Sequence, residues 1–204
     1  TMVTARSPAA TAARDPYDGK VAVITGSSSG LGAELARVAA DRGMKLVLVD
    51  VNLAPSVALA QHVEEAGGEA VAVKVDLADA EQRGHVIETA VERFGRIDYL
   101  FNNAGYSYMA RLEQMDLGQA HHLFEVNYWA YADLAKRVIP HMKEQGGGTI
   151  LNIASILGHV PAGADSGLGH YGATKHAVVG LFKTAAQELE PHGIRVHVAS
   201  PGGM

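Results

Sequence analysis

The sequence predicts an α/β fold in which helices cover both faces of one doubly wound parallel sheet. Short apolar runs rich in β-branched residues alternate with helical stretches from Lys20 onward. Continuous apolar runs of this kind are typical of strands that are buried on both faces. The first run also leads directly into a glycine-rich turn that opens a helix. We therefore expect one domain over residues 19–204, preceded by a flexible N-terminal leader over residues 1–18.

Six strands and five helical stretches follow from this alternation. The strands are expected at residues 21–24, 45–49, 70–75, 97–101, 149–154 and 194–198. The helices are expected at residues 30–42, 54–66, 79–94, 116–145 and 171–189. Asp79 is a plausible cap for the third helix, and Pro140 predicts a kink or break in the fourth. On the first helix, the expected buried stripe consists of Leu31, Leu35, Val38 and Ala39.

The composition excludes several classes of protein and partner. The net charge of −5 is a poor match for a phosphate backbone, so nucleic acid is not an expected partner. The chain has no cysteine, which excludes disulfides and cysteine-ligated metal. No apolar run reaches the roughly 18 residues that a membrane span needs, and the leader lacks the apolar core of a secretion signal. We expect a cytoplasmic protein that has no membrane association.

The turn after the first strand has the composition of a phosphate-binding loop. It reads Thr25-Gly26-Ser27-Ser28-Ser29-Gly30-Leu31-Gly32. Glycines let the backbone approach a pyrophosphate closely, and the N-terminus of the following helix offers free N–H groups. We expect a cofactor to contact Gly26, Ser28, Ser29, Gly30, Leu31 and Gly32. On the glycines alone, a turn that merely connects two elements is an equally good explanation.

Asp50 at the end of the second strand favours the dinucleotide interpretation. It stands 24 residues after Gly26, about where such domains place the acid that holds the adenosine ribose. A carboxylate there would bind a 2′,3′-diol and repel a 2′-phosphate, so NAD is expected rather than NADP. A solvated aspartate in a turn is the alternative. Asp76, with Leu77 beside it, has the right position to meet the adenine, although an aspartate at such a position, taken alone, is more often a helix cap.

Tyr171 and Lys175 lie one helical turn apart on the same face of the last helix. A free tyrosine has a pKa of about 10, and a base near neutrality needs a value roughly three units lower. One positive charge at ~4 Å and an effective dielectric of ~20 supplies about the required 4 kcal/mol. Ser155 ends the fifth strand, where it could hold a substrate oxygen beside the phenol, or could simply cap a loop.

Several motifs occur together in the order and spacing of one known family. They are Thr25-Gly26-x-x-x-Gly30-x-Gly32, Asn102-Asn103-Ala104-Gly105, Asn127, Ser155, Tyr171-x-x-x-Lys175 and Pro201-Gly202. From about Lys20 to its end, the chain resembles the short-chain dehydrogenase/reductases, in the compact single-domain branch with a Rossmann-type fold. The resemblance implies an NAD-dependent oxidoreductase that moves a hydride between NAD(H) and a secondary alcohol or ketone.

The resemblance also implies a role for individual residues. Tyr171 would be the general acid/base, Lys175 would favour its ionised form and bond the nicotinamide ribose, and Ser155 would orient the substrate oxygen. Asn127 would hold a water in a proton relay through Lys175. The cofactor cleft would be lined by Asn102, Asn103, Ala104, Gly105, Pro201 and Gly202. No metal is expected, because the ten histidines show no ligand spacing with carboxylates.

Two departures from the family pattern concern the substrate side. Ser155 and Tyr171 are 16 residues apart, slightly more than is usual, and the extra residues fall in a flexible loop at 161–167 that could shape the substrate pocket. The family also continues beyond Pro201-Gly202 with a substrate-covering loop and a seventh strand, which the sequence lacks. Tyr106, Tyr108 and Met109 suggest a partly apolar pocket, and His159 and His170 are candidates for its mouth.

Other interpretations and an assembly stay open at this level. A non-catalytic dinucleotide-binding protein, or a cofactor-assisted epimerase or dehydratase on the same fold, would share most of these motifs. Family members usually form homodimers or homotetramers through the helices at residues 116–145 and 171–189. The small or apolar residues that would permit this contact, or simply fill the core, are Ala130, Ala132, Ala135, Ala177, Val178 and Leu181.

Overall fold

The computed structural model describes residues 15–202 and contains one parallel sheet of six strands. The strands are β1 (Val21–Thr25), β2 (Lys45–Asp50), β3 (Ala70–Lys74), β4 (Tyr99–Asn102), β5 (Gly148–Ile153) and β6 (Ile194–Ala199). Their order in the sheet is β3-β2-β1-β4-β5-β6. The chain therefore builds outward from β1 in one direction and then in the other, which creates a switch point between β1 and β4. The predicted doubly wound parallel fold is confirmed.

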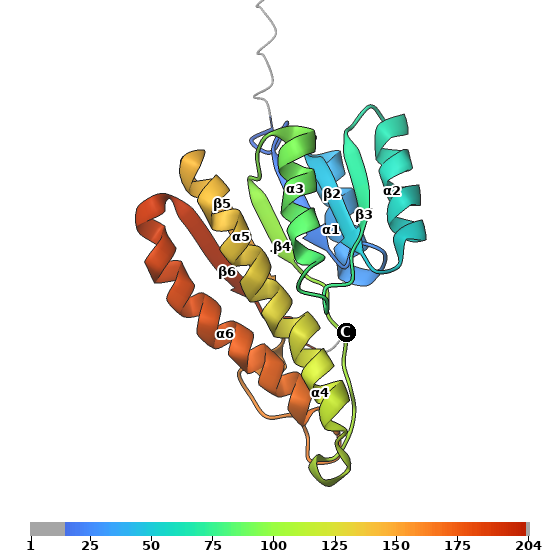
Figure 1. Cartoon of the computed structure of the whole chain (residues 1–204), viewed down its shortest axis with the longest axis vertical. Coiled ribbons are helices and arrows are strands. Elements are labelled where there is room, and N and C mark those ends of the chain that lie inside the picture. The colour runs from blue at the N-terminus through green and yellow to red at the C-terminus, as the bar shows by residue number, and fades with distance from the viewer. Residues whose placement is uncertain (1–14, 203–204) are drawn as a thin grey trace, which may run out of the picture.

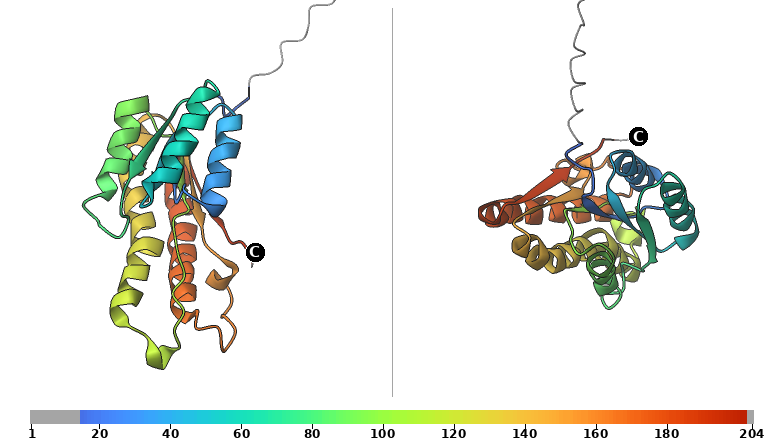
Figure 2. Two further views of the ribbon diagram at one scale, coloured as in Figure 1. Left: turned by 90° about the vertical axis from the view of Figure 1, so that its right-hand side faces the viewer. Right: turned by 90° about the horizontal axis from the view of Figure 1, so that it is seen from above.

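Helices cover both faces of the sheet (Figures 1 and 2). One face carries α1 (Gly30–Asp41) and α2 (Leu53–Glu65), and the other carries α3 (Arg83–Phe94), α5 (Ala130–Glu144) and α6 (Gly169–Leu189). The short α4 (Leu117–Phe124) precedes α5. Strands β1 to β4 feed both cores, because neighbouring residues such as Ala22 and Val23 point to opposite faces. Strands β5 and β6 contribute to one of these cores only. Burial on both faces explains why β1 and β2 are continuous apolar runs, whereas β6 alternates apolar and polar residues.

The predicted stripe on α1 is wrong in one position. Val38 is 57% exposed, and α1 instead buries Gly32, Ala33, Ala36 and Ala39. These small residues let the helix lie close to the sheet. The larger side chains of Leu31 and Leu35 are half-buried beside that contact.

The start of α3 differs from the prediction, because Asp79 does not cap it. The helix begins at Arg83, after Gln82. Asp79 instead accepts hydrogen bonds from the Glu81 backbone N–H and the Gln82 side-chain amide, at 2.9 and 2.8 Å. Asp79 thus stabilises a turn ahead of the helix.

The fourth helical stretch is irregular, but not at the predicted place. Helix α5 runs through Pro140, which is exposed, so water can solvate the carbonyl that the proline leaves without a donor. The irregularity lies earlier, in a π-helical turn at Glu125–Trp129 between α4 and α5. A π-helical turn inserts one extra residue per turn and is often found at functional sites.

The described part of the expected leader contacts the domain. Asp15 pairs with Arg42 at 2.6 Å, and the Tyr17 ring lies 5.8 Å from the ring of Tyr99. The folded part of the chain therefore takes in residues 15–18, whereas residues 1–14 of the expected leader lie outside the described residues. Between residues 15 and 202, no helix is long and apolar enough to cross a membrane.

Candidate active site

The carboxyl ends of the strands meet at one edge of the sheet and open into a pocket of about 530 Å³. This size is within the range of small-molecule and cofactor sites. The structure brings many of the predicted cofactor residues together in its wall: Gly26, Ser29, Gly30, Leu31, Asp50, Asp76, Leu77, Asn103, Ala104 and Gly105. Segments from four strand ends thus converge on one pocket.

Other predicted cofactor residues lie beside this pocket rather than in its wall. Ser28 supports it, because its backbone N–H donates to Asp50 Oδ2 at 3.0 Å. Gly32 packs the first turn of α1 against the loop, where a Cβ would overlap the Gly26 carbonyl oxygen and the Asn103 side chain. Pro201 accepts a hydrogen bond from the Ile156 backbone N–H at 2.9 Å. This bond ties the segment after β6 to the segment after β5.

Asp50 has both carboxylate oxygens fixed by the backbone. Oδ2 accepts from the Ser28 N–H at 3.0 Å, and Oδ1 accepts from the Asn52 N–H at 2.9 Å. Each oxygen keeps lone-pair capacity for a further donor. The carboxylate is therefore oriented in the pocket wall and able to accept hydrogen bonds from a diol.

Thr25 organises the wall, although no role for its side chain was expected from the sequence. Its buried Oγ1 accepts hydrogen bonds from the backbone N–H groups of Asn103 and Ala104, both at 3.0 Å, and donates to the Phe101 carbonyl at 3.2 Å. The side-chain amide of Asn103 in turn donates a hydrogen bond to the Thr25 carbonyl at 2.9 Å. The two loops that face each other across the switch point are therefore bound together at Thr25.

Asn102 does not line the pocket, contrary to the expectation. Its amide donates to Asn152 Oδ1 at 2.9 Å and to the Tyr131 carbonyl at 3.3 Å. The side chain is fully buried and joins β4 to β5 and α5. A buried amide between strands is a structural feature that a motif comparison cannot distinguish from a cofactor contact.

Lys175 is buried on α6, one helical turn after Tyr171. Its ammonium donates to the Ile153 carbonyl at 2.8 Å and lies 5.6 Å from the centre of the Tyr171 ring and 5.3 Å from that of Tyr131. Burial lowers the pKa of Lys175 to about 8 and raises the pKa of Tyr131 well above its usual range. The rings of Tyr171 and Tyr131 lie within cation–π range of the charge.

Ser155 and Tyr171 are carried by segments that pack directly on each other. Ser155 precedes a 3₁₀ turn (Ile156–Gly158), and its Oγ accepts from the Leu157 N–H at 3.2 Å. A Cβ at Gly158 would lie 2.8 Å from the Lys175 carbonyl oxygen, which shows how tightly the turn lies on α6. Because the Ser155 oxygen accepts this bond, its hydroxyl proton is free to be donated elsewhere.

Asn127 lies in the π-helical turn and is fully buried. Its Oδ1 accepts from the Tyr106 N–H at 3.1 Å, and its Nδ2 donates to the Tyr106 carbonyl at 2.9 Å and to Thr174 Oγ1 at 3.3 Å. Asn127 thus joins the loop after β4 to α6, one residue from Lys175. A Cβ at Gly105 would lie 3.1 Å from Asn127 Oδ1 and 3.6 Å from Lys175 Nζ, so these groups meet at one point.

The pocket wall also includes residues that the sequence did not assign to the cofactor, namely Val51, Val75, Tyr106, His122 and Val126. The Tyr106 hydroxyl and His122 Nδ1 are 2.7 Å apart. Val126 enters the wall because the π-helical turn carries it there. A turn of this type leaves no readable mark in the hydrophobic pattern.

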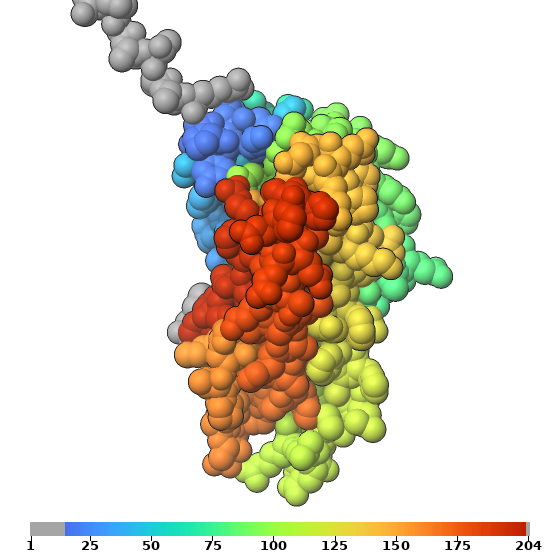
Figure 3. Space-filling model, turned by 90° about the vertical axis from the view of Figure 1, so that its left-hand side faces the viewer, coloured from blue at the N-terminus to red at the C-terminus, as the bar shows by residue number. Residues whose placement is uncertain are grey.

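The extra loop residues before Tyr171 line a second pocket, of about 710 Å³. The loop is held to the segment after β4 by the Arg111–Asp165 ion pair at 2.9 Å and by the Ala110 N–H, which donates to the Gly167 carbonyl at 2.9 Å. Figure 3 shows these two segments, in orange and yellow-green, side by side at one end of the molecule. His170 lines this second pocket and stacks on Tyr108, with ring centres 6.0 Å apart.

The remaining histidines are scattered. His159 bonds Ser200 through Nε2 at 2.9 Å, beside the segment after β6. In the part of the chain that the structure describes, no group of three or more histidine, aspartate or glutamate side chains could hold a metal ion.

Comparisons with known proteins identify the family of the chain. The family model described as short chain dehydrogenase matches residues 20–204. A 2,5-dichloro-2,5-cyclohexadiene-1,4-diol dehydrogenase of Sphingobium indicum is 37% identical over 186 residues, which cover 91% of this chain and 73% of the relative. A cyclohexanol dehydrogenase of Acinetobacter is 35% identical over 187 residues, again 91% and 73% of the two chains.

Solved structures show the same fold with a nucleotide bound. A short-chain dehydrogenase/reductase from Burkholderia phymatum in complex with NAD has a TM-score of 0.86 and 34% identity, over 91% of this chain and 66% of that chain. A metagenomic short-chain oxidoreductase in complex with NADP has a TM-score of 0.85 and 32% identity, over 92% and 84% of the two chains. Because the family model matches nearly the whole described domain and these relatives are more than 30% identical, the chain belongs to the short-chain dehydrogenase family of oxidoreductases.

Proposed function

We propose that the protein is an NAD-dependent dehydrogenase or reductase that moves a hydride between NAD(H) and a secondary alcohol or ketone. The observation that carries the cofactor preference is the charge of the pocket wall. Asp50 and Asp76 line it, whereas no lysine or arginine does so among the described residues. A 2′-phosphate would meet two carboxylates and no cation there, so we favour NAD, although relatives include complexes of both nucleotides.

The residues of the pocket fit a dinucleotide. The N–H groups in the first turn of α1 have no partners within the helix, and Ser29 and Gly30 bring that turn into the pocket wall. Asp50 would accept hydrogen bonds from the hydroxyls of the adenosine ribose. Asp76 and Leu77 would border the adenine, and Gly105 would approach the nicotinamide end, since it lies beside Lys175.

The nicotinamide would accept or supply the hydride, and the protein would manage the proton. In alcohol oxidation, the Tyr171 phenolate would take the proton from the substrate hydroxyl. Lys175 would stabilise that phenolate, because its ammonium lies 5.6 Å from the centre of the ring. Ser155 would donate its hydroxyl proton to the substrate oxygen and hold it beside Tyr171.

The relatives suggest which substrates to try first. Two of them are named for alicyclic substrates, a dichlorocyclohexadiene diol and cyclohexanol. We therefore propose a secondary alcohol of the alicyclic class. The second pocket is lined in part by apolar side chains, such as those of Leu112, Leu157 and Val160, and this lining is compatible with such a ring.

The test is turnover of cyclohexanol with NAD⁺, comparing the wild-type protein with Tyr171→Phe. Loss of the acid/base should lower kcat by roughly 10²–10⁴-fold and leave NADH binding intact. Tyr99→Phe is the matched control, because the Tyr99 ring packs between Tyr17 and Phe101, away from the pocket. Unchanged kcat in Tyr171→Phe would refute this role for the phenol.

We also propose a homodimer or homotetramer formed through α5 and α6. Of the residues expected at this contact, Ala130, Ala135 and Val178 fill the core instead. Trp129, the last residue before α5, is 50% exposed and offers an apolar surface there. Light scattering of the wild type and of Trp129→Glu would test this assembly, and a wild-type monomer would contradict it.

A further inference from the structure

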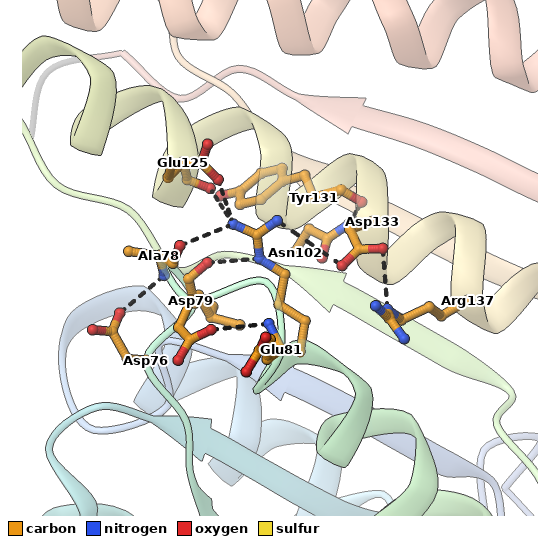
Figure 4. Close-up of polar contacts among 11 residues, drawn as sticks. Asp76, Ala78, Asp79, Glu81, Asn102, Glu125, Tyr131, Asp133 and Arg137 are labelled. Atoms are coloured by element: carbon orange, nitrogen blue, oxygen red, sulfur yellow. Dashed lines mark hydrogen bonds and ion pairs between the residues drawn. The ribbon is translucent and has the colours of Figure 1, made fainter.

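A buried guanidinium lies between two segments of the cofactor pocket. Arg83 is 4% exposed in its side chain. On one side it donates to the Leu77 carbonyl at 2.8 Å and the Ala78 carbonyl at 3.4 Å. On the other side it donates to the Glu125 carboxylate at 2.7 Å and the Glu125 carbonyl at 3.4 Å. In Figure 4, dashed lines converge on one guanidinium from Ala78 and Glu125 on the left and from Asp133 on the right.

Both segments that Arg83 joins line the same pocket. Asp76 and Leu77 form one part of its wall, and Val126, the residue after Glu125, forms another. Arg83 itself is not in the wall. The contacts of Arg83 therefore reach the pocket through these two segments.

The contact with Glu125 also concerns the π-helical turn. The Ala130 N–H donates to the Glu125 carbonyl, five residues back, which is the hydrogen bond that makes the turn wide. Arg83 supplies a second donor to that carbonyl. The same turn carries Asn127, so Arg83 supports the backbone that directs Asn127 toward Tyr106 and Thr174.

The charges around Arg83 make the contact costly to lose. A buried cation needs paired charges and hydrogen bonds, and Arg83 has Glu125 at 2.7 Å and Asp133 at 3.9 Å. Asp133 also accepts from Arg137 at 3.0 Å. Without the Arg83 guanidinium, the Leu77 carbonyl would lose a donor, and the two carboxylates would lose the cation that lies between them.

We propose that Arg83 is a positioning residue that cross-links the Leu77–Ala78 backbone to the π-helical turn, and so sets the shape of the pocket at its adenosine end. The inference rests on the proposed NAD site for its binding assay. At a temperature well below unfolding, Arg83→Met should weaken binding of both NADH and AMP by roughly tenfold or more. Arg83→Lys keeps the charge but not the forked geometry, so it should recover part of that loss.

Arg137→Met is the matched control, because Arg137 bonds Asp133 but touches neither pocket segment. It should bind NADH and AMP like the wild type. A role in stability alone would lower the unfolding temperature of Arg83→Met without changing either affinity, and wild-type affinity in that variant would overturn the proposal. If Arg83→Met does not fold, the binding of NADH and AMP by Arg83→Lys tests the proposal instead. Affinities of Arg83→Lys equal to those of the wild type would overturn the proposal.

A second readout separates this proposal from the proposed function. Deuterium exchange at residues 76–78 and 125–130 needs no ligand and should be faster in both segments of Arg83→Met, but not of Arg137→Met. If the wild type binds neither NADH nor AMP, the proposed function fails, and exchange alone decides the role of Arg83. Wild-type exchange in either segment would then refute the cross-link.

Discussion

The Lys175 ammonium donates a 2.8 Å hydrogen bond to the Ile153 carbonyl, two residues before Ser155. This contact ties the helix that carries Tyr171 to the end of β5, just before the segment that carries Ser155. It places a charge where only 3% of the Lys175 surface is exposed, and burial lowers the pKa of that ammonium to about 8. The site therefore holds its cation at a cost in stability.

Lys175→Met should make the protein more stable at about pH 7 while removing its activity. The lowered pKa of Lys175 means that burying its ammonium costs the folded state about 3 kcal/mol, which the variant avoids. The variant also loses the hydrogen bond to the Ile153 carbonyl, which offsets about 1 kcal/mol of this stabilisation. Urea unfolding should therefore show the variant more stable by about 2 kcal/mol. Lys183→Met, which removes an exposed lysine of the same helix, should change little.

The gain from Lys175→Met should shrink as the pH rises. Below pH 8, Lys175 is charged in both the folded and the unfolded protein, so the full cost is present. Between about pH 8 and the ordinary lysine value of 10.5, the unfolded state binds more protons, and wild-type stability rises relative to the variant. A stability difference that stayed constant over this range would contradict the assignment.

Thr25→Val should separate the two loops at the switch point. The substitution keeps the shape of the side chain but leaves the Asn103 and Ala104 N–H groups without their acceptor. We expect a loss of roughly 2–3 kcal/mol in the free energy of unfolding, together with weaker NADH binding. Thr25→Ser keeps the hydroxyl, so its free energy of unfolding should fall by only about 1 kcal/mol or less, because of the missing methyl group. Equal stability of the two variants would show that these hydrogen bonds contribute nothing.

Gly32→Ala should disrupt the glycine-rich turn by a steric clash. A Cβ there would overlap the Gly26 carbonyl oxygen and the Asn103 side chain, so α1 must move away from the turn. We expect roughly 3 kcal/mol of destabilisation, measured by thermal unfolding. Gly180→Ala is the opposite case, because a Cβ at that helical position meets no neighbouring atom. This variant should raise the free energy of unfolding by about 0.5–1 kcal/mol. An unchanged melting temperature in Gly32→Ala would argue against the close approach.

Much of the fold could be predicted, because β1 to β4 are buried on both faces. Continuous apolar runs such as Val21–Thr25 are typical of such strands, and each of these four strands is followed along the chain by a helix. The positions of Asp50 and Ser155 follow from the same logic, since Asp50 is the last residue of β2 and Ser155 lies two residues after the end of β5. The site residues come from different strand ends that a single sheet edge brings together.

The sequence-based predictions that proved wrong concern features that depend on tertiary contacts. The wide turn at Glu125–Trp129 depends on donors from elsewhere, including Arg83, and not on a helix-breaking residue such as Pro140. The late start of α3 reflects hydrogen bonds of Asp79 that compete with a helix. Arg83 itself reads as an ordinary surface cation on α3, and only the packed structure shows that it is buried between charges.

The most direct test of the account is a titration with NADH and NADPH, followed by nicotinamide fluorescence, on the wild type, Asp50→Asn and Asp50→Ala. A like charge at ~4 Å costs about 4 kcal/mol at an effective dielectric of ~20, before screening. We predict that the wild type binds NADH at least roughly tenfold more tightly than NADPH, and that the preference falls in Asp50→Asn and disappears in Asp50→Ala. Equal or tighter binding of NADPH by the wild type, or binding of neither nucleotide, would contradict the account.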